Sequence, residues 1–424
     1  MNLPHIPQEL VSAILDFLSD DKLALSQSSL VSREWVLPSR ILLFKSLQIN
    51  DLHHLHSLGA SEYISTHVRD ISLTRWYDWG RSYRTPRELR LSDIFELLDC
   101  LPNLRSVTLC SANISAKSPN ESSTLKRYSL KALSLEDCVI DTQSTLLQIL
   151  GLFSSINNLT LIHPSFTSPL SDRDRQPRGS ISQELGRFVP QPPTKISTLS
   201  VQLASWISGS MLDCLALDPP PYIANSISIE IPRIRGDTVA SAVALLRTLG
   251  SKTTSLLLDF RKAITDGSST DSLISSISFC PKIESLSLGL VLDSDLPETL
   301  TRSWQILFGI FDSLPSSTLT TLRQFRILWN IYGHDIKSRV YTQENWNELD
   351  MRLQRFQRLE KVEFRWEISQ YYWQWLKDVG ELKPEPFTID TLVWGIGSET
   401  IKKLLPGVHA RSLLVFSTAD PVPH

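Results

Sequence analysis

Histidine is the residue type in this chain with the widest chemistry, because its imidazole binds metal ions and transfers protons near neutral pH. The densest group is His53, His54 and His56, followed at a distance by His67. This spacing differs from the HExxH pattern, in which two imidazoles meet on one helix face, and no cysteine lies nearby to complete a zinc site. We therefore interpret the group as solvated histidines of a linker and expect no metal site.

Cysteine is the second residue type that could act as a ligand, a redox pair or a nucleophile. The chain has five: Cys100, Cys110, Cys138, Cys214 and Cys280. They form no CxxC pair, so we interpret them as reduced, partly buried thiols.

The N-terminus lacks a basic and apolar leader, and no uncharged apolar run approaches about 18 residues. These features predict a cytoplasmic or nuclear protein without a membrane span.

Motifs of covalent and phosphate chemistry are missing as well. No glycines have the spacing of a GxSxG nucleophile elbow or a GxxxxGK[ST] phosphate loop, and Gly395 and Gly397 lack the third glycine of a dinucleotide fingerprint. The 42 basic and 45 acidic side chains give a net charge of −3, which removes the basic excess typical of nucleic-acid binding. We expect a non-catalytic protein with no cofactor, no nucleic acid and no membrane among its partners. An enzyme built on a repeat scaffold is the third-ranked alternative.

A short apolar phrase recurs along the chain and predicts its architecture. It consists of an apolar residue, two variable residues and then an apolar-x-apolar pair, as in 130–135 and 283–288. The pairs begin at positions 71, 107, 133, 159, 199, 227, 256, 286, 325, 362, 392 and 413, with steps that average about 31 residues. Stretches with helical apolar spacing, such as 94–101 and 239–249, lie between them. Each unit is therefore expected to form a strand, a turn and a helix.

Stacking is the physical consequence of this pattern. A short parallel strand buries alternate side chains on one face, and a single unit cannot cover that face alone. The phrase resembles the leucine-rich repeat over roughly residues 65–416, in the irregular form common in fungal and plant receptor proteins. The usual Asn or Cys after each strand is mostly missing, although Cys110 and Cys138 lie near that place. The resemblance implies an α/β solenoid over 71–416 with a parallel curved sheet and outer helices.

Some segments interrupt the repeats. Residues 163–195 contain six prolines and a cluster of charges, which predicts a long exposed loop. Residues 48–70 are expected to be a linker and the entry to the first repeat, and 417–424 a tail. The segment 75–84 is rich in aromatic and arginine residues, a composition enriched at binding surfaces. A packed surface loop explains that composition equally well.

The first 47 residues follow a different pattern. Leu10, Ile14 and Leu18 are spaced for one face of a helix, Val11 and Leu15 extend the stripe, and a proline stands near the start. A segment of this size can bury only a modest core. It therefore needs a partner or a neighbouring domain.

The same residues resemble an F-box, in the form found in many F-box proteins of mushroom-forming (basidiomycete) fungi. The resemblance implies a small all-helical domain over 1–47 that docks on a Skp-type adaptor, which connects to a cullin and its RING subunit. The residues that would bind the adaptor are Ile6, Pro7, Leu10, Ile14, Leu15, Leu18, Leu23, Leu30, Val31 and Trp35. The repeats would then select an unknown protein substrate for ubiquitination, which makes the chain a substrate-recognition subunit.

Strand phase predicts where such a substrate would bind. Trp329 and Trp366 continue the inward alternation of their strands, so they are expected in the core. The candidate target-binding residues are the outward charges and a nearby aromatic run: Arg326, Glu363, Arg365, Glu367, Tyr371, Tyr372 and Trp373. Simple helix packing is the alternative for the aromatic run.

A second interpretation of the N-terminal segment remains open. Repeat arrays require capping elements at their ends. The F-box-like stripe could pack only against the first repeats, which would make the chain a non-ligase interaction scaffold.

Overall fold

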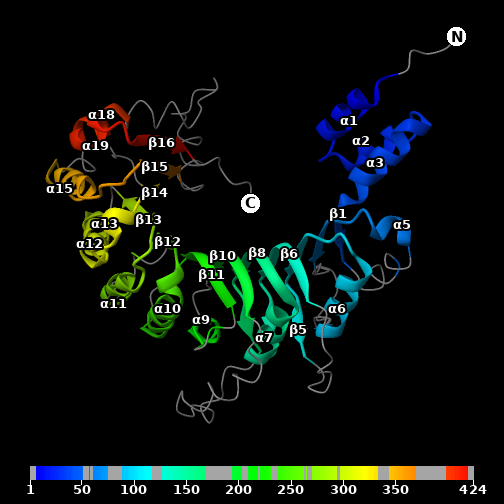
Figure 1. Cartoon of the computed structure of the whole chain (residues 1–424), viewed down its shortest axis with the longest axis horizontal. Helices are drawn as coiled ribbons and strands as arrows, with labels where there is room; N and C mark the ends of the chain where they lie inside the picture. The colour runs from blue at the N-terminus through cyan, green and yellow to red at the C-terminus, as the bar shows by residue number, and fades with distance from the viewer. Residues whose placement is uncertain are drawn as a thin grey trace. The chain divides into compact units, whose positions relative to one another are not determined.

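The computed structural model describes residues 6–50, 57, 61–74, 88–116, 127–167, 193–202, 209–217, 220, 222–230, 236–261, 264, 270–293, 297–332, 343–368 and 398–418. These residues form two compact units, one ending at Thr194 and the other beginning at Lys195. Both units combine helices with strands of a long parallel sheet (Figure 1). The expectation of a mixed α/β fold is confirmed.

The first unit opens with three helices, α1 (Gln8–Phe17), α2 (Lys22–Ser28) and α3 (Arg33–Lys45). The Asp21 side chain accepts a hydrogen bond of 2.9 Å from the Ala24 amide and thereby caps α2. A small core holds the helices together and consists of Val11, Leu15 and Leu25, with Leu18, Trp35, Leu42 and Leu43 packed against it. The helical segment therefore has an interior of its own.

A parallel sheet follows directly on α3. Its strands, in spatial order, are β1 (Ser46–Ile49), β2 (Asp70–Thr74), β4 (Ser106–Cys110), β6 (Tyr128–Glu136) and β8 (Phe153–Ile162). The sheet begins at Ser46, whereas the repeated phrase placed the first strand at Ile71 and a linker from residue 48. Phe44, Leu47 and Ile49 repeat the same apolar phrase, but these residues were assigned to the N-terminal segment and the linker. Leu47 and Ile49 pair with Ile71 and Leu73, which makes β1 the first strand of the sheet.

A second, short parallel sheet accompanies the first and was not predicted. Its strands are β3 (Glu88–Arg90), β5 (Asn113–Ser115), β7 (Val139–Ile140) and β9 (Ser165–Phe166). Ser111, Asp137 and His163 have φ angles of 51°, 51° and 46°, and each lies between a strand of the main sheet and one of β5, β7 and β9. The Cys138 thiol donates to the Leu109 carbonyl oxygen at 3.1 Å and so joins consecutive repeats, near the place that the Asn or Cys of a leucine-rich repeat usually takes.

The remaining helices of the first unit are α5 (Glu62–Ser65), α6 (Leu91–Cys100) and α7 (Gln143–Gly151). Ile94, Leu97 and Leu98 of α6 are buried, as their helical spacing predicted. The loop predicted over 163–195 contains β9 near its start and ends within β10, and residues 168–192 lie outside the described residues.

The second unit continues the pattern of strand and helix. Its strands, in spatial order, are β10 (Thr194–Gln202), β11 (Tyr222–Glu230), β12 (Ser255–Asp259), β13 (Ser285–Asp293), β14 (Gln324–Tyr332), β15 (Lys361–Ile368) and β16 (Leu414–Thr418). Its helices are α9 (Gly209–Leu215), α10 (Gly236–Leu249), α11 (Asp271–Ser276), α12 (Pro297–Ser313), α13 (Thr318–Thr321), α15 (Gln343–Gln354), α18 (Ser398–Leu404) and α19 (Pro406–Ala410), with 3-10 turns η3 (Gly250–Lys252) and η5 (Ile277–Phe279). Figure 1 shows α10 to α15 on the same side of the strands.

Shared carbonyl groups link neighbouring repeats at the start of several strands. The Thr254 carbonyl oxygen accepts from the amides of Glu284 and Ser285 at 2.7 and 3.0 Å, and the Glu284 carbonyl oxygen accepts from Arg323 and Gln324 at 2.8 and 3.0 Å. In the first unit the Arg69 carbonyl oxygen accepts in the same way from two consecutive amides. This linkage fixes where each strand begins relative to the one before it.

Strand phase was predicted correctly for most of the repeats. The residues opposite one another on β13, β14 and β15, such as Leu286, Phe325 and Val362, are buried. The prediction for β16 was wrong by one residue, because Leu414 pairs with Val362 and leaves Val415 exposed. The pair predicted at residue 392 lies outside the described residues.

Aromatic side chains fill the core behind β14 and β15. Trp329 and Trp366 are buried, as predicted. The Trp304 ring lies 5.8 Å from the ring of Trp329 and 5.2 Å from that of Trp346, and the Trp346 ring lies 5.9 Å from Phe364. These contacts join α12 and α15 to the sheet.

Asp350 is a buried carboxylate that ties α15 to α19. Its oxygens accept from the amides of Gly407 and Val408 at 3.0 Å each and from the Gln354 side chain at 2.7 Å. The amides belong to the first turn of α19, where a negative charge is favourable.

The replacement Asp350→Ala is expected to lower the free energy of unfolding by about 1–3 kcal/mol, because it leaves buried amides without an acceptor. Urea denaturation measures the loss. The control is Glu344→Ala, an exposed acid of the same helix, whose effect should stay within about 0.5 kcal/mol. Equal losses for the two variants would contradict the capping role.

Candidate functional site

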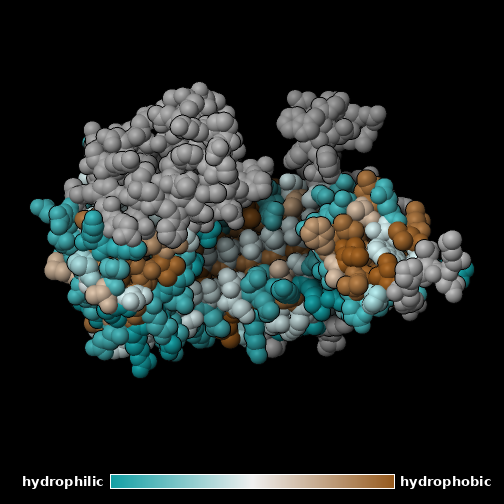
Figure 2. Space-filling view, turned by 90° about the horizontal axis from the view of Figure 1, so that it is seen from above, coloured by the Kyte–Doolittle hydropathy of each residue, from teal (hydrophilic) through white to brown (hydrophobic). Residues whose placement is uncertain are grey.

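Large apolar side chains are exposed on the three N-terminal helices and in the segments that flank and join them. We call this set the N-terminal apolar surface: Ile6, Leu10, Ile14, Phe17, Leu23, Leu30, Val31 and Leu37. The exposed fraction is 56% for Leu10, 90% for Phe17 and 85% for Leu30. Figure 2 shows hydrophobic residues gathered at this end of the chain, on the right of the view. Large exposed apolar residues that gather in one region of a protein mark interaction sites.

The surface arises because α1 has two apolar faces. Val11 and Leu15 lie on the face that enters the internal core. Leu10, Ile14 and Phe17 are spaced i, i+4 and i+7, so they share another face, and this face is exposed. A helix that is apolar on two sides can bury only one of them in a three-helix segment.

The structure divides the predicted adaptor-binding residues into two groups. Ile6, Pro7, Leu10, Ile14, Leu23, Leu30 and Val31 are exposed. The expectation for Leu15 was wrong, because its exposed fraction is 0% and it belongs to the internal core. Leu18 and Trp35 also pack against that core, which gives them an internal role. The wide stripe predicted from spacing therefore combined two neighbouring faces of α1, of which one is buried and the other exposed.

Phe17 and Leu37 belong to the surface but were not predicted as contact residues. For Phe17 the signal was present, because it lies three residues after Ile14 and seven after Leu10. Leu37 precedes Pro38 inside α3, and the spacing of that helix did not indicate which side would be exposed.

A second candidate surface lies on β14, β15 and β16, on the side of the strands away from the buried tryptophans. Its centre is Glu363, whose carboxylate lies 2.9 Å from the Arg326 guanidinium and 2.7 Å from the Lys361 ammonium group. The Ser417 hydroxyl donates to the same carboxylate at 2.8 Å. We call these four residues the Glu363 cluster. It joins three neighbouring strands through one side chain.

Charge and burial explain the ionisation of Glu363. Its side chain is 8% exposed, and burial alone would raise the pKa of the carboxyl group. The hydrogen bonds from its three neighbours and the positive charge of Arg326 outweigh that effect and lower the pKa to about 2. Glu363 is therefore ionised at neutral pH and holds two cations in place.

The other predicted target-binding residues are only partly described. Arg365 is half-buried and lies opposite Leu328 on β14 and Ser417 on β16. Glu367 belongs to β15 and pairs with Asn330, but its side chain is not among the described ones. Tyr371, Tyr372 and Trp373 lie outside the described residues, as does the aromatic and arginine-rich segment 75–84.

The thiols of the described residues are poor nucleophiles where they are buried. Burial raises the pKa of Cys138, Cys214 and Cys280 to about 12 in each case. All five cysteines are free.

Over the described ranges no three His, Cys, Asp or Glu residues come together as a metal site, and none of the described helices is long and apolar enough to span a membrane. The predicted linker histidines His53, His54 and His56 are not described.

Comparison with known proteins gives little further information. No family model matches the chain, and no curated protein matches it either. Among solved structures, the chain is similar to the leucine-rich repeat-containing protein LegL7 from Legionella pneumophila, with 14% sequence identity and a TM-score of 0.42. The match covers 89% of this chain and 91% of that one.

The replacement Glu363→Gln tests the charge of the Glu363 cluster. Because the folded-state pKa lies below the ordinary value of 4.5, the charge stabilises the fold fully above about pH 4.5, and this stabilisation is lost as the pH falls through about 2. At pH 7 we expect the variant to lose about 1–3 kcal/mol of unfolding free energy. The difference from the original chain should shrink between pH 4.5 and pH 2, as measured by urea denaturation across that range.

The matched control is Glu360→Gln. Glu360 is exposed and contacts Arg323 at 3.2 Å, so its effect should stay within about 0.5 kcal/mol. If the difference in unfolding free energy between Glu363→Gln and the original chain is the same at every pH, the shape of the side chain, and not its charge, explains the loss.

Proposed function

We propose that this chain is a non-catalytic substrate-recognition subunit of a Skp-cullin-F-box type ubiquitin ligase. The observation that carries the proposal is the N-terminal apolar surface, which is exposed on a helical segment whose own core is already complete. In this proposal the surface binds a Skp-type adaptor, and a cullin joins through that adaptor. The resemblance to F-box proteins of mushroom-forming fungi and a cytoplasmic or nuclear location belong to the same proposal.

Burial of the exposed side chains would supply a favourable free energy for complex formation. Burial of a large apolar side chain contributes about 1.5–3 kcal/mol, so eight partly exposed ones supply on the order of 10 kcal/mol before the costs of association. Phe17, with the largest exposed fraction, is the natural anchor, because aromatic side chains dominate the energy of protein interfaces.

The repeats would bind the protein substrate. Their strands carry the Glu363 cluster, whose charged groups are held in position by ion pairs before any partner arrives. Preordered side chains lose less conformational entropy on binding than free ones. The contribution to catalysis would be proximity, since the target is held near a ubiquitin carrier that other subunits supply.

The test is binding of the full chain to a purified Skp-type adaptor, measured by calorimetry. The double replacement Leu10→Asp and Phe17→Asp puts charges on the exposed face of α1 and spares the internal core. It should weaken binding at least about a hundredfold, because each charge would be buried without a partner. Circular dichroism and the thermal midpoint should stay close to those of the original chain.

Met351→Asp is the matched control. Met351 is 58% exposed on α15, in the other unit, so its change introduces a similar charge far from α1 in the sequence. Adaptor binding should be unaffected. If the full chain is folded and binds no adaptor, or if the double variant binds as well as the original, the ligase proposal fails.

A capping role is the second candidate, and the connection between α3 and β1 favours it. The last residue of α3 directly precedes β1, the Lys45 carbonyl oxygen accepts from the Arg69 amide at 2.9 Å, and the Lys22 ammonium group donates to the Ser46 carbonyl oxygen. Deletion of residues 1–45 leaves β1 intact and separates the two roles. The capping role is supported if the full chain binds no adaptor and the deletion lowers the stability of the repeats. The ligase role is supported if the full chain binds the adaptor and the deletion abolishes this binding but leaves the repeats stable.

A further inference from the structure

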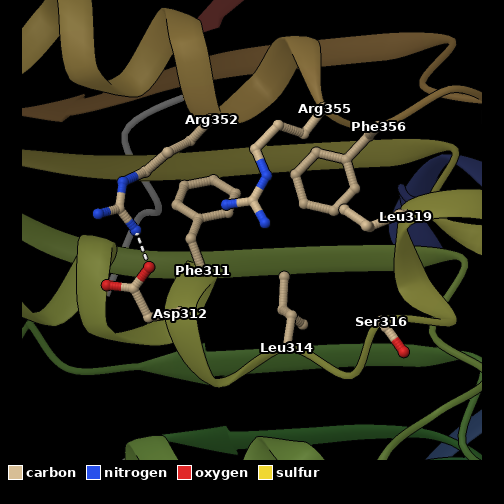
Figure 3. A pocket seen from close by; sticks show the side chains of 8 residues that line it. All are labelled: Phe311, Asp312, Leu314, Ser316, Leu319, Arg352, Arg355 and Phe356. Carbon is tan, nitrogen blue, oxygen red and sulfur yellow. Dashed lines mark hydrogen bonds and ion pairs between the residues drawn. The ribbon is translucent and has the colours of Figure 1, made fainter.

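A surface pocket of about 180 Å³ lies among three helices of the second unit. Its lining comes from α12, the turn that follows it, α13, the end of α15 and the two residues after α15 (Figure 3). The residues are Phe311, Asp312, Leu314, Ser316, Leu319, Arg352, Arg355 and Phe356. The pocket belongs neither to the N-terminal apolar surface nor to the Glu363 cluster.

Its floor is rigid and apolar. Phe311 and Phe356 are buried, and their ring centroids lie 5.9 Å apart. Phe311 also packs against Phe325 of β14 at 5.1 Å, which connects the floor to the sheet. A preformed apolar floor of this kind accepts an apolar group without rearrangement.

The two arginines of the lining differ in their partners. Arg352 pairs with Asp312 and, at 2.6 Å, with Glu348, and its guanidinium lies 5.0 Å above the ring of Phe308. Its charge is therefore already compensated. Arg355 is exposed and makes no ion pair with any described residue. Figure 3 shows its guanidinium extended over the pocket, near the rings of Phe311 and Phe356.

The volume of the pocket limits the size of the group that it can bind. Small-molecule and cofactor sites usually measure about 300–1,000 Å³, and this pocket is smaller. It has room for one large side chain. An aromatic or leucine side chain that enters a pocket beside a complementary charge is a typical arrangement at the centre of a protein interface.

We infer that this pocket binds a segment of a partner protein in which a phenylalanine- or leucine-sized side chain stands beside an acidic residue. The apolar side chain packs against the floor formed by Phe311 and Phe356, and the carboxylate pairs with Arg355. The inference is independent of the proposed ligase role, because it concerns the helical side of the second unit.

The test uses the full chain and a blocked five-residue peptide with a central 4-fluorophenylalanine between two glutamates. Fluorine NMR titration follows binding, which we expect with a dissociation constant of about 1 mM or below, as is usual for one anchor and one ion pair. A peptide with lysines in place of the glutamates should bind at least about tenfold more weakly. A peptide with central alanine has no fluorine and competes poorly with the labelled one.

Two single replacements locate the site. Arg355→Glu should weaken binding of the glutamate peptide at least about tenfold. Arg358→Glu changes an exposed arginine three residues further on that does not line the pocket, and it should leave binding unchanged. Both positions are exposed, so both variants should fold.

Three outcomes would overturn the inference. They are no detectable binding up to about 5 mM peptide, equal binding of the lysine peptide, or equal effects of Arg355→Glu and Arg358→Glu, which would indicate general surface charge. Adaptor binding at the N-terminal apolar surface should be the same for Arg355→Glu and the original chain. The two proposals can therefore fail separately.

Discussion

The parallel ladder, with one strand contributed by each repeat, is the constraint on which the rest of this structure depends. Several strands start at a carbonyl group that accepts two consecutive amides of the next repeat, as the carbonyl groups of Thr254 and Glu284 do. This fixed start keeps the apolar residues of neighbouring strands opposite one another. The helices can then cover a continuous apolar face, which a single repeat could not bury.

The ladder also decides where charged side chains meet. Arg326 and Glu363 lie opposite each other because β14 and β15 pair in register, and Ser417 reaches the same carboxylate from β16. The ion pairs form between strands that are distant in the sequence. An acidic side chain in such a place is nearly buried yet ionised, and it stabilises the side of the sheet that the helices leave open.

The N-terminal helices are held together by a small apolar core and not by strand pairing. Their core is complete with a few side chains, and α1 is apolar on two faces, so one of these remains exposed. The exposed face of α1 and the pocket beneath Arg355 are different kinds of surface. The first consists of side chains that project outward as anchors, whereas the second is a recess that receives one.

The sequence by itself determined the repeated strand and helix pattern, the inward phase of Trp329 and Trp366, and the helical stripe of α1. These features depend on the period of apolar residues, which is a local property of the chain. Sequence reasoning overlooked β1, although Phe44, Leu47 and Ile49 repeat the same apolar phrase, and the pairing with Ile71 and Leu73 assigns it to the sheet. It also missed the short strands β5, β7 and β9, which are too brief to show a period.

Only the tertiary structure separated Leu15 from Leu10, because both are apolar and lie on the same helix. Which of them is buried depends on where α2 and α3 pack. The same holds for Glu363, two of whose three partners come from neighbouring strands, and for Arg355, which makes no ion pair with a described residue although Arg352 on the same segment makes two. Spacing along one segment predicts a face, but the contacts between segments decide what that face touches.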